Sequence, residues 1–500
     1  MAYLLARYDL EKFKWKPLKG VGSPKGCVRR LGGGEQTQDI LHRRFKCLYT
    51  LFFGLMVDLH DPSAGARSAS NFPTIASSIG GSDELPTLTY TTGTPQAIDW
   101  WAQRTLLVHS PSHVDLEQLR VDESQRMVPS LDGDYCWMHF VPGELANDGT
   151  VSKFGLLLHS HHSLFDAIAV KIIMNVYLDQ LSKALSGSRS TSDSVKWGNE
   201  LENLPPAVFN ILNSEVLPIS PGSAQEPSDE GVNYFLIWSF GDLFVNMKDA
   251  YGFKDYPKDT EWPKTRRAEV LFTEEESASI LATAKTSGFT LTHVANAALA
   301  MVIIADNPPS SEFSSHYLNN IAMFNRRGRL ISNWSLYPGY ALSFASIRIP
   351  ISEFLSFDGS VLPLNKDVLL KVAELAKGQY QAHAELPSGL SQCAQLGELS
   401  ASALAGNNTK MPADRCYTFS SDGKGELYLN PTFTSDTGET VLSVDKFLSV
   451  NTSDADPIFR LSSWSGAIDI GVDYNTNIVK AEDMMNYLNQ WKRFMLLVFD

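Results

Sequence analysis

The sequence predicts two mixed lobes of the α/β or α+β class, joined by a polar linker. Its 500 residues are too many for one compact core. Strand-like and helix-like segments alternate irregularly in both halves, which is typical of mixed lobes. Between residues 186 and 231 the chain becomes polar and rich in Pro and Ser ("SGSRSTSDS", then "LPISPGSAQEPSDEG"). We therefore assign residues 1–200 to an N-terminal lobe and residues 201–500 to a C-terminal lobe.

In the first half, residues 1–45 are basic and Gly-rich, and we expect them to drape over the fold rather than to form a domain. Residues 48–58 read as a buried strand, and residues 61–86, rich in Gly, Ser and Pro, as a loop with at most one short helix. "DYCWMHFVPG" (134–143) and "SKFGLLLHSH" (152–161) flank a turn-rich stretch and predict a hairpin. The strongest helix of this half is predicted over 166–185, where apolar residues recur at helical spacing.

The second half shows the same mixture of elements. It predicts strands at 269–273, 319–325, 341–349 and 460–474, helices at 274–288 and 289–303, and a closing amphipathic helix at 481–499.

Composition limits the classes of function. A 43% hydrophobic content supports substantial cores, and the net charge of −14 argues against nucleic acid as the main ligand. The five cysteines are widely spaced and form no CxxC pair, so we do not expect a framework of disulfides or metal sites. We expect the protein to reside in a reducing compartment. No signal-peptide pattern opens the chain, and the most apolar run, from Leu48, spans about a dozen residues, too few for a membrane span. We expect a soluble, cytoplasmic protein.

The stretch "LLLHSHHSLFDAIAV" (156–170) places His159, His161 and His162 between a strand-like run and a helix-like run, with Asp166 at the start of the latter. Metal binding is one interpretation, but no second His/Glu cluster in the sequence completes a site, and adjacent histidines on an extended backbone point apart. The histidines could also be core residues with satisfied hydrogen bonds. General-base chemistry is the third interpretation, because a neutral imidazole with a pKa near ~6.5 accepts a proton at physiological pH. The residues alone leave this choice open.

"HHSLFDA" resembles the HHxxxDG signature of the acyltransferase superfamily that contains chloramphenicol acetyltransferase, plant BAHD acyltransferases and peptide-synthetase condensation domains. Further segments resemble the family in the family's order, over roughly residues 20–500. They are "GFTLTHVANAALAMVI" (288–303), "MFNRRGRL" (323–330), "YPGYALSF" (337–344), "YTFSSDGKGEL" (417–427, taken as the crossover strand) and "RLSSWSGAIDIGVDYN" (460–475, taken as the late strand). "RRLGGGEQ" (29–36) and "KWGNELENLPP" (196–206) are similar to the fungal branch of trichothecene 15-O-acetyltransferases and alcohol acetyltransferases.

Two features depart from the family pattern. Ala167 replaces the glycine of the signature, and the plant D-F-G-W-G motif is absent, since "SSDGKG" does not match it. The chain therefore does not resemble a plant-type enzyme, and its contacts with coenzyme A stay unassigned.

The resemblance implies two chloramphenicol-acetyltransferase-like lobes in a V-shaped pseudo-dimer with a central tunnel. It also implies that His162 is the general base of a direct acyl transfer without an acyl-enzyme. Asp166 would hold the loop by pairing with an arginine, a role compatible with a simple cap on the following helix. The candidate arginines are Arg29, Arg30, Arg326 and Arg327.

The remaining site residues follow from the same resemblance. His161 is expected to support or pack against His162, and His159 to face the core. Ser420 is a candidate oxyanion donor or a serine that bonds locally at a strand end. The residues expected to line or support the tunnel are Asn325, Arg326 and Gly423.

The expected co-substrate is acetyl-CoA or another acyl-CoA, with no metal and no permanently bound cofactor. Basic residues in 264–267 and 325–329 are candidates for its phosphates. The expected acceptor is an alcohol of a small secondary metabolite, and a monomer suffices because one chain supplies both lobes. Two alternatives remain: a standalone condensation-type domain that uses a carrier-protein thioester, and a repurposed tunnel that binds or cyclises a small molecule.

Overall fold

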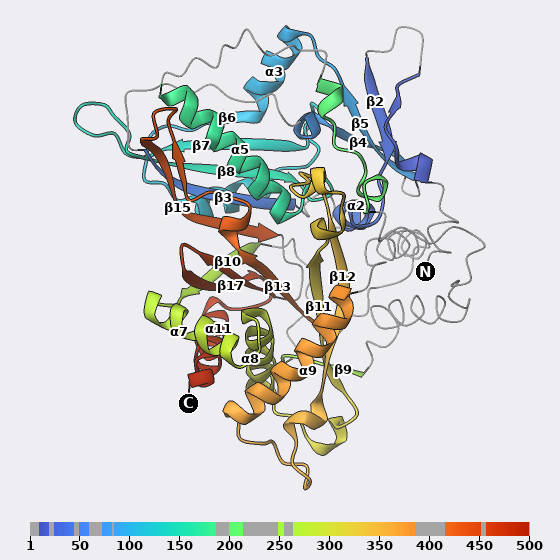
Figure 1. Ribbon diagram of the computed structural model, residues 1–500, viewed down its shortest axis with the longest axis vertical. Helices are drawn as coiled ribbons and strands as arrows, with labels where there is room; N and C mark the ends of the chain where they lie inside the picture. Colours follow the sequence, from blue (N-terminus) through green and yellow to red (C-terminus); the bar gives the residue numbers. More distant parts are fainter. Residues whose placement is uncertain are drawn as a thin grey trace.

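A computed structural model describes residues 10–19, 25–44, 50–59, 73–82, 85–186, 200–213, 249–254, 264–385, 416–451 and 457–499. Two large sheets, each covered by helices, lie one above the other in Figure 1, and a small third sheet flanks the first. Of the predicted linker, residues 187–199 and 214–231 lie outside the described residues, and the division at residue 200 stays a prediction.

The first large sheet carries the histidine motif. Its strands, in spatial order, are β14 (Thr432–Thr434), β15 (Thr440–Asn451), β3 (Thr50–Leu59), β8 (Lys153–His161), β7 (Cys136–Pro142) and β6 (Leu106–Val108). The predicted strand at 48–58 and the predicted hairpin are confirmed as β3 and as the antiparallel pair β7–β8. β14 and β15 come from the C-terminal half, so the chain crosses back into the first sheet.

The second large sheet holds the C-terminal strands. In spatial order they are β10 (Thr265–Leu271), β17 (Ala467–Asn475), β16 (Ile458–Trp464), β13 (Cys416–Lys424), β11 (Tyr317–Asn325) and β12 (Leu342–Pro350), with β9 (Ala250–Tyr251) beside β11. The expected single strand at 460–474 is a hairpin, because Ser465 and Gly466 both adopt positive φ, at 50° and 85°, and close a tight turn. The expected crossover strand at 417–427 is also corrected: β13 stays in the second sheet, parallel to β11 and β16, and β15 makes the crossing.

The third sheet contains β1 (Lys16–Pro17), β2 (Gly26–Arg30), β5 (Leu85–Thr91) and β4 (Ser78–Ser82). It corrects two expectations. The first 45 residues do not merely drape over the fold, since they supply β1, β2 and helix α2 (Gly34–Arg44), and the expected loop at 61–86 contains β4. The sequence "SIGGS" lacks strand propensity, but its backbone pairs with β5 over all five residues.

Helices pack on the large sheets. α5 (Ala167–Leu185) contacts β3, β14 and β15 and contributes to the core of the first sheet. α8 (Leu291–Asp306) is buried from His293 to Ile304 and packs between α9 (Lys366–Glu385) and α11 (Ala481–Leu496), where the Trp491 indole donates to the Ala295 carbonyl at 2.8 Å. α7 (Glu274–Thr286), α8 and α11 confirm the three helices predicted in the second half, whereas α9 was not predicted.

The remaining described helices are α3 (Pro95–Thr105), α4 (Leu116–Glu123) and short 3-10 helices. The latter are Leu10–Phe13, Pro73–Ala76, Glu200–Asn203, Val208–Asn210, Ser311–Phe313, Arg327–Arg329, Ser332–Trp334, Ile351–Phe354, Gly425–Leu427 and Leu497–Phe499. Within the described part of the chain, no single helix has the length and apolar character of a membrane span; α7 and α8 meet both criteria only as a pair bent by 103°.

Candidate active site

His162 lies in the tight connection between β8 and α5, near the seam between the two large sheets. Its side chain is only 5% exposed. The Nδ1 atom is 2.9 Å from the Phe165 carbonyl oxygen, so Nδ1 carries the proton and donates to that carbonyl. Nε2 therefore bears the lone pair, and it accepts a hydrogen bond from Asn451 Nδ2 at 3.0 Å.

Burial also sets the protonation state of His162. It lowers the pKa of the imidazole below the ordinary 6.5, against the opposing effects of the Phe165 carbonyl and the nearby Asp166 carboxylate. The ring is therefore neutral at physiological pH and presents a basic nitrogen at a fixed position.

Asp166 holds this connection from three sides and is completely buried. Its Oδ1 caps α5 by accepting from the Ala169 amide at 2.7 Å, and the same oxygen accepts from Arg327 Nη2 at 2.8 Å. Its Oδ2 accepts from the Ala341 amide at 2.9 Å. Arg327 is thus the partner among the four candidate arginines, and the cap and the ion pair coexist.

Arg327 ties the motif to the second sheet. It follows β11, is 2% exposed, and donates to the carbonyls of Tyr337 and Gly339 at 2.9 and 2.7 Å. Arg327 of "NRRGR" and Ala341 of "YPGYALSF" therefore both contact the carboxylate of the histidine motif, although more than 160 positions separate them from Asp166.

Asn451 was not predicted as a site residue. It ends β15, the crossover strand, opposite Leu51 of β3. Its amide N–H donates to Asp473 of β17 at 3.3 Å, and its side-chain Oδ1 is buried without a hydrogen-bond partner among the described residues. No local motif marks this asparagine, because only the crossing of β15 into the first sheet brings it to His162.

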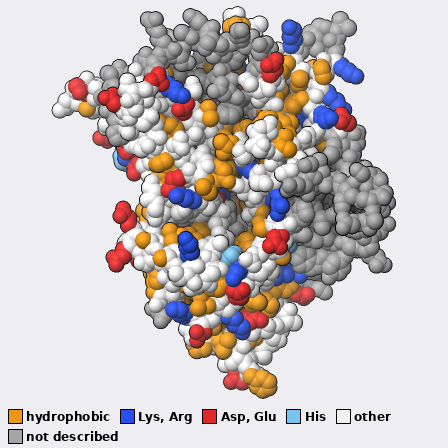
Figure 2. Space-filling view, viewed as in Figure 1, with side chains coloured by type: hydrophobic (Ala, Val, Ile, Leu, Met, Phe, Trp, Pro, Cys, Tyr) orange, Lys and Arg blue, Asp and Glu red, His pale blue; other side chains and the backbone are white. Residues whose placement is uncertain are grey.

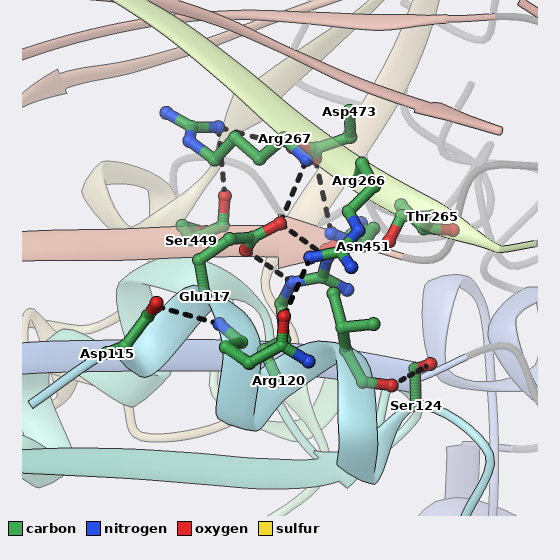
Figure 3. Close-up of polar contacts among 12 residues, drawn as sticks. Asp115, Glu117, Arg120, Ser124, Thr265, Arg266, Arg267, Ser449, Asn451 and Asp473 are labelled. Carbon is green, nitrogen blue, oxygen red and sulfur yellow. Dashed lines mark hydrogen bonds and ion pairs between the residues drawn. The ribbon is translucent and has the colours of Figure 1, made fainter. Parts of the chain in front are cut away.

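The seam beside Asn451 is held by buried charge (Figure 3). Asp473 pairs with Arg460 at 2.6 Å and with Arg267 at 3.2 Å. Across the seam, Arg120 of α4 donates to the Thr265 carbonyl of β10 at 2.7 Å, and Glu117 accepts from the Arg267 amide at 3.0 Å. These contacts join the first-half helix α4 to the second sheet.

The same contacts occupy Arg267 and Arg326, two of the basic residues that were candidates for the phosphates of coenzyme A. Arg267 is buried among Asp473, Asp469 and Glu269, whose charges raise its pKa, so its guanidinium is committed to carboxylates. Arg326 is 5% exposed and donates to Ser343 and to the carbonyls of His383 and Ala384. Neither arginine presents a free cation to a ligand.

Asn325 and Arg326, expected at the tunnel, support the segment that carries Arg327. Asn325 Oδ1 accepts from the Arg327 amide at 3.1 Å, and its Nδ2 donates to the Tyr428 hydroxyl at 2.7 Å. These hydrogen bonds, like those of Arg326, hold the chain after β11, which carries Arg327.

Ser420 and Gly423 lie on β13, which pairs with β16. Ser420 is 8% exposed, and its hydroxyl donates to Asp422 at 3.3 Å. Gly423 has a φ of +67° and sits at a register shift of the β13–β16 pair, so the glycine fits a bulge that bends the strand. The hydroxyl of Ser420 is thus bonded locally, to Asp422 of its own strand.

Lys171, one turn into α5, was not singled out by sequence. It is completely buried, with Nζ 3.8 Å from Asp422 Oδ2 and 4.6 Å from the centre of the Phe447 ring. Burial lowers the pKa of this amine. In the sequence, Lys171 is one of several polar residues of this helix, and nothing in the local pattern indicates that it is buried.

His161 and His159 occupy the strand itself. His161 Nδ1 accepts from the Ser163 amide at 3.1 Å, and its ring packs against that of His42 with centroids 3.9 Å apart. His159 is fully buried between Phe52 and Trp137, as the sequence predicted for a core-facing residue, and its ring nitrogens have no hydrogen-bond partner among the described residues.

Comparison with known proteins gives a consistent result. The family model described as 15-O-acetyltransferase Tri3 matches residues 141–335, which include the histidine motif and Arg327. Trichothecene O-acetyltransferase TRI3 of Trichoderma arundinaceum is 23% identical over 371 residues, covering 71% of this chain and 66% of that protein. Trichothecene 15-O-acetyltransferase TRI3 of Fusarium sporotrichioides is 22% identical over 526 residues, covering 97% of this chain and 96% of that one. The predicted resemblance is confirmed.

Solved structures agree on the fold. The structure of TRI3 from Fusarium sporotrichioides matches 98% of this chain and 99% of its own with a TM-score of 0.82 at 19% identity. The first condensation domain of the CDA synthetase matches 94% of this chain and 96% of its own, with a TM-score of 0.59 at 13% identity. The fold is therefore that of two chloramphenicol-acetyltransferase-like lobes, as the sequence predicted.

Proposed function

We propose that this chain transfers an acyl group, most simply acetyl, from an acyl-CoA thioester to a hydroxyl of a small secondary metabolite. The observation that carries the proposal is the buried, neutral His162, whose Nε2 lone pair is fixed by the Phe165 carbonyl on the other nitrogen. An O-acyltransferase requires such a base, and the Tri3-type relatives carry this activity in their names.

In the proposed reaction, the acceptor hydroxyl takes the place of the Asn451 amide at Nε2 and gives up its proton to that atom as its oxygen attacks the thioester carbonyl. The tetrahedral intermediate then collapses, the carbon–sulfur bond breaks, and His162 returns the proton to the leaving thiolate. No acyl-enzyme forms, so no nucleophilic serine or cysteine is needed. Base catalysis of this kind accounts for about 10²–10⁴-fold in rate.

Four residues have proposed supporting roles. Asp166 and Arg327 keep the connection between β8 and α5 in place, so that His162 keeps its orientation. Asn451 orients the acceptor through its side-chain NH2 group and through Oδ1, which has no partner within the described part of the chain. Ser420 is proposed as a donor to the oxyanion once a substrate separates it from Asp422.

The acceptor would reach this site from the molecular surface. Figure 2 shows apolar side chains gathered near the middle of the face on which α5 and the segment after β11 meet in Figure 1. Elsewhere on this face, acidic and basic side chains are interspersed in the described part of the surface. An apolar, polycyclic alcohol suits such a surface better than a charged polymer does.

A carrier-protein thioester is the second candidate donor. Two observations favour it. The fold matches condensation domains. In addition, Arg267, Arg326 and Arg327, three of the basic residues in the candidate phosphate segments, are engaged by protein groups.

The test measures acceptor-dependent thiol release from acetyl-CoA by the wild type, by His162→Ala, and by His113→Ala as a control at an exposed histidine. The acceptor panel consists of hydroxylated trichothecenes, other hydroxylated terpenoids and polyketides. We expect release by the wild type and the control and a loss of at least about 10²-fold in His162→Ala. Thiol release that survives in His162→Ala would overturn the assignment of His162 as the base. Release that occurs only with an acyl-loaded carrier protein would show that the donor is a carrier-protein thioester rather than an acyl-CoA.

A further inference from the structure

A second cluster of ionisable side chains lies on the face of the first sheet that packs against α4. His139 on β7 pairs with Leu157 of β8, and His159 lies two residues further along β8, so the two histidines are diagonal neighbours on one face. Glu123, the last residue of α4, reaches the same place. One ligand atom from each of Glu123, His139 and His159 lies within 4.8 Å of the other two.

Three buried ring nitrogens of the two histidines in this cluster have no hydrogen-bond partner among the described residues. His159 is completely buried, and neither of its ring nitrogens has a hydrogen-bond partner among the described residues. Nε2 of the equally buried His139 also lacks one within the described part of the chain. A buried polar atom that has lost its water and gained no partner destabilises the folded state. Three such atoms in one place indicate that a group other than the protein belongs there.

The second nitrogen of His139 is already positioned. Its Nδ1 lies 3.1 Å from Nε2 of His109, and the two rings stack with centroids 5.3 Å apart. When His139 donates from Nδ1, its Nε2 lone pair faces Glu123, whose Oε2 is 4.0 Å away. Histidines that bind metals are held in this way by a partner on the other ring nitrogen.

We propose that Glu123, His139 and His159 bind one divalent transition-metal ion, with zinc as the probe. Two imidazoles and one carboxylate are a common zinc donor set, and the partly exposed side of Glu123, with 17% of its side chain accessible, gives the ion a path from solvent. No short sequence pattern marks this site, because its three ligands come from α4, β7 and β8, three separate elements. The bound ion links α4 to β7 and β8. Of these two strands, β8 ends immediately before His162.

Arg126 competes with the ion for Glu123. Its Nε is 2.5 Å from Glu123 Oε2, the oxygen that faces His139. Because 34% of the Arg126 side chain is accessible, it has room to turn to solvent when the ion takes its place. Arg126→Gln therefore removes both the competitor and a nearby positive charge, and we expect it to tighten zinc binding.

The test uses the untagged, full-length protein, stripped with a chelator and titrated with zinc chloride by calorimetry, with metal content measured after desalting. We expect one zinc per chain, a raised thermal midpoint, at least about tenfold weaker binding in Glu123→Gln, and tighter binding in Arg126→Gln. His113→Ala, at an exposed histidine, should behave as the wild type.

His159→Phe provides a variant that keeps the ring volume and removes the orphaned nitrogens. We expect it to fold, with an unchanged circular dichroism spectrum, and to lose both the stoichiometric zinc and the zinc-induced rise in thermal midpoint. Absence of stoichiometric zinc from the wild type, or equal zinc binding by Glu123→Gln and the wild type, would overturn the proposal. Since no measurement uses acyl transfer, the result is independent of the proposed reaction.

Discussion

Replacing Asp166 by asparagine removes one charge from the centre of the site and changes little else in shape. The carboxylate is fully buried and accepts from the Ala169 amide, from Arg327 and from the Ala341 amide. If the asparagine keeps its oxygen at the first two contacts, its NH2 group faces the Ala341 N–H, and two donors meet. If the side-chain amide is flipped instead, its NH2 group faces both the Ala169 amide and Arg327, and these two contacts are lost rather than one.

The magnitude follows from the burial of both partners. Breaking a buried ion pair by removing one charge costs about 3–5 kcal/mol, because Arg327, at 2% exposure, keeps its charge without a counter-ion. The Tyr337 and Gly339 carbonyls still solvate the guanidinium, so we expect the lower part of this range. Against a total stability of about 5–15 kcal/mol, such a loss is readily measured.

Asp179→Asn is the matched control. Asp179 lies on the same helix and pairs with Lys183 at 2.7 Å, but both side chains are about two-fifths exposed. Exposed pairs of this kind contribute about 0–1 kcal/mol. The two variants therefore make the same chemical change on the same motif-bearing segment and differ in burial and in position.

The assay is urea unfolding followed by tryptophan fluorescence, together with the rate of acyl transfer. We expect Asp166→Asn to lose at least about 2 kcal/mol more than Asp179→Asn and to lower kcat more than it raises KM, since the connection that holds His162 loosens. Equal unfolding midpoints in the two variants would refute the argument that the Asp166–Arg327 pair holds the motif together.

The remaining predictions concern the base and the seam. Because the pKa of His162 is lowered and the reaction needs the neutral ring, we expect kcat/KM to stay constant as the pH falls to 6.5 and to decline only below it, as a pH–rate profile would show; a decline that begins above about pH 7 would contradict this. Asn451→Ala should lower kcat roughly 10²-fold with a small change in the thermal midpoint, and an unchanged kcat would exclude Asn451 from the reaction. Arg120→Met, which removes the charged donor to the Thr265 carbonyl, should cost about 1.5–3 kcal/mol in urea unfolding; a cost below about 0.5 kcal/mol would show that this contact does not hold the seam.

The sequence predicted the elements whose pattern is local. The strand at β3, the hairpin β7–β8, and helices α5, α8 and α11 each carry their periodicity or turn residues within one segment. The histidine motif was visible for the same reason, since β8, His162 and the Asp166 cap follow one another closely in the chain.

Pairings between distant segments were not predicted. The polar "SIGGS" forms β4 because β5 supplies backbone partners, and β15 leaves its own half of the sequence to pair with β3. Strand pairing of this kind depends on the order of strands in space, which neither propensity nor periodicity encodes. The expected crossover at 417–427 was wrong for this reason.

The same distinction between local and distant contacts explains why the residues that contact His162 and Asp166 could not be identified from the sequence. Asn451 lies 289 positions from His162, and Arg327 lies 161 positions from Asp166, so no local sequence pattern connects them. Arg327 could be named only as one of four candidates, on a resemblance, and Asn451 was missed altogether. Each becomes informative only when β11 and β15 bring it to the seam.

The placement of these partners has a mechanical consequence. His162 belongs to the first sheet, but Arg327 follows β11 of the second sheet, and Asn451 is bonded to Asp473 of β17. A shift of one large sheet relative to the other would therefore act on Asp166 through Arg327 and on Asn451, which itself lies on the first sheet, through its hydrogen bond to Asp473. Since Arg120 and Glu117 fix that seam from α4, the geometry of the base depends on contacts that never touch the substrate. Substitutions at the seam should accordingly lower kcat in proportion to their effect on stability, whereas substitutions on the exposed face of α5 should not.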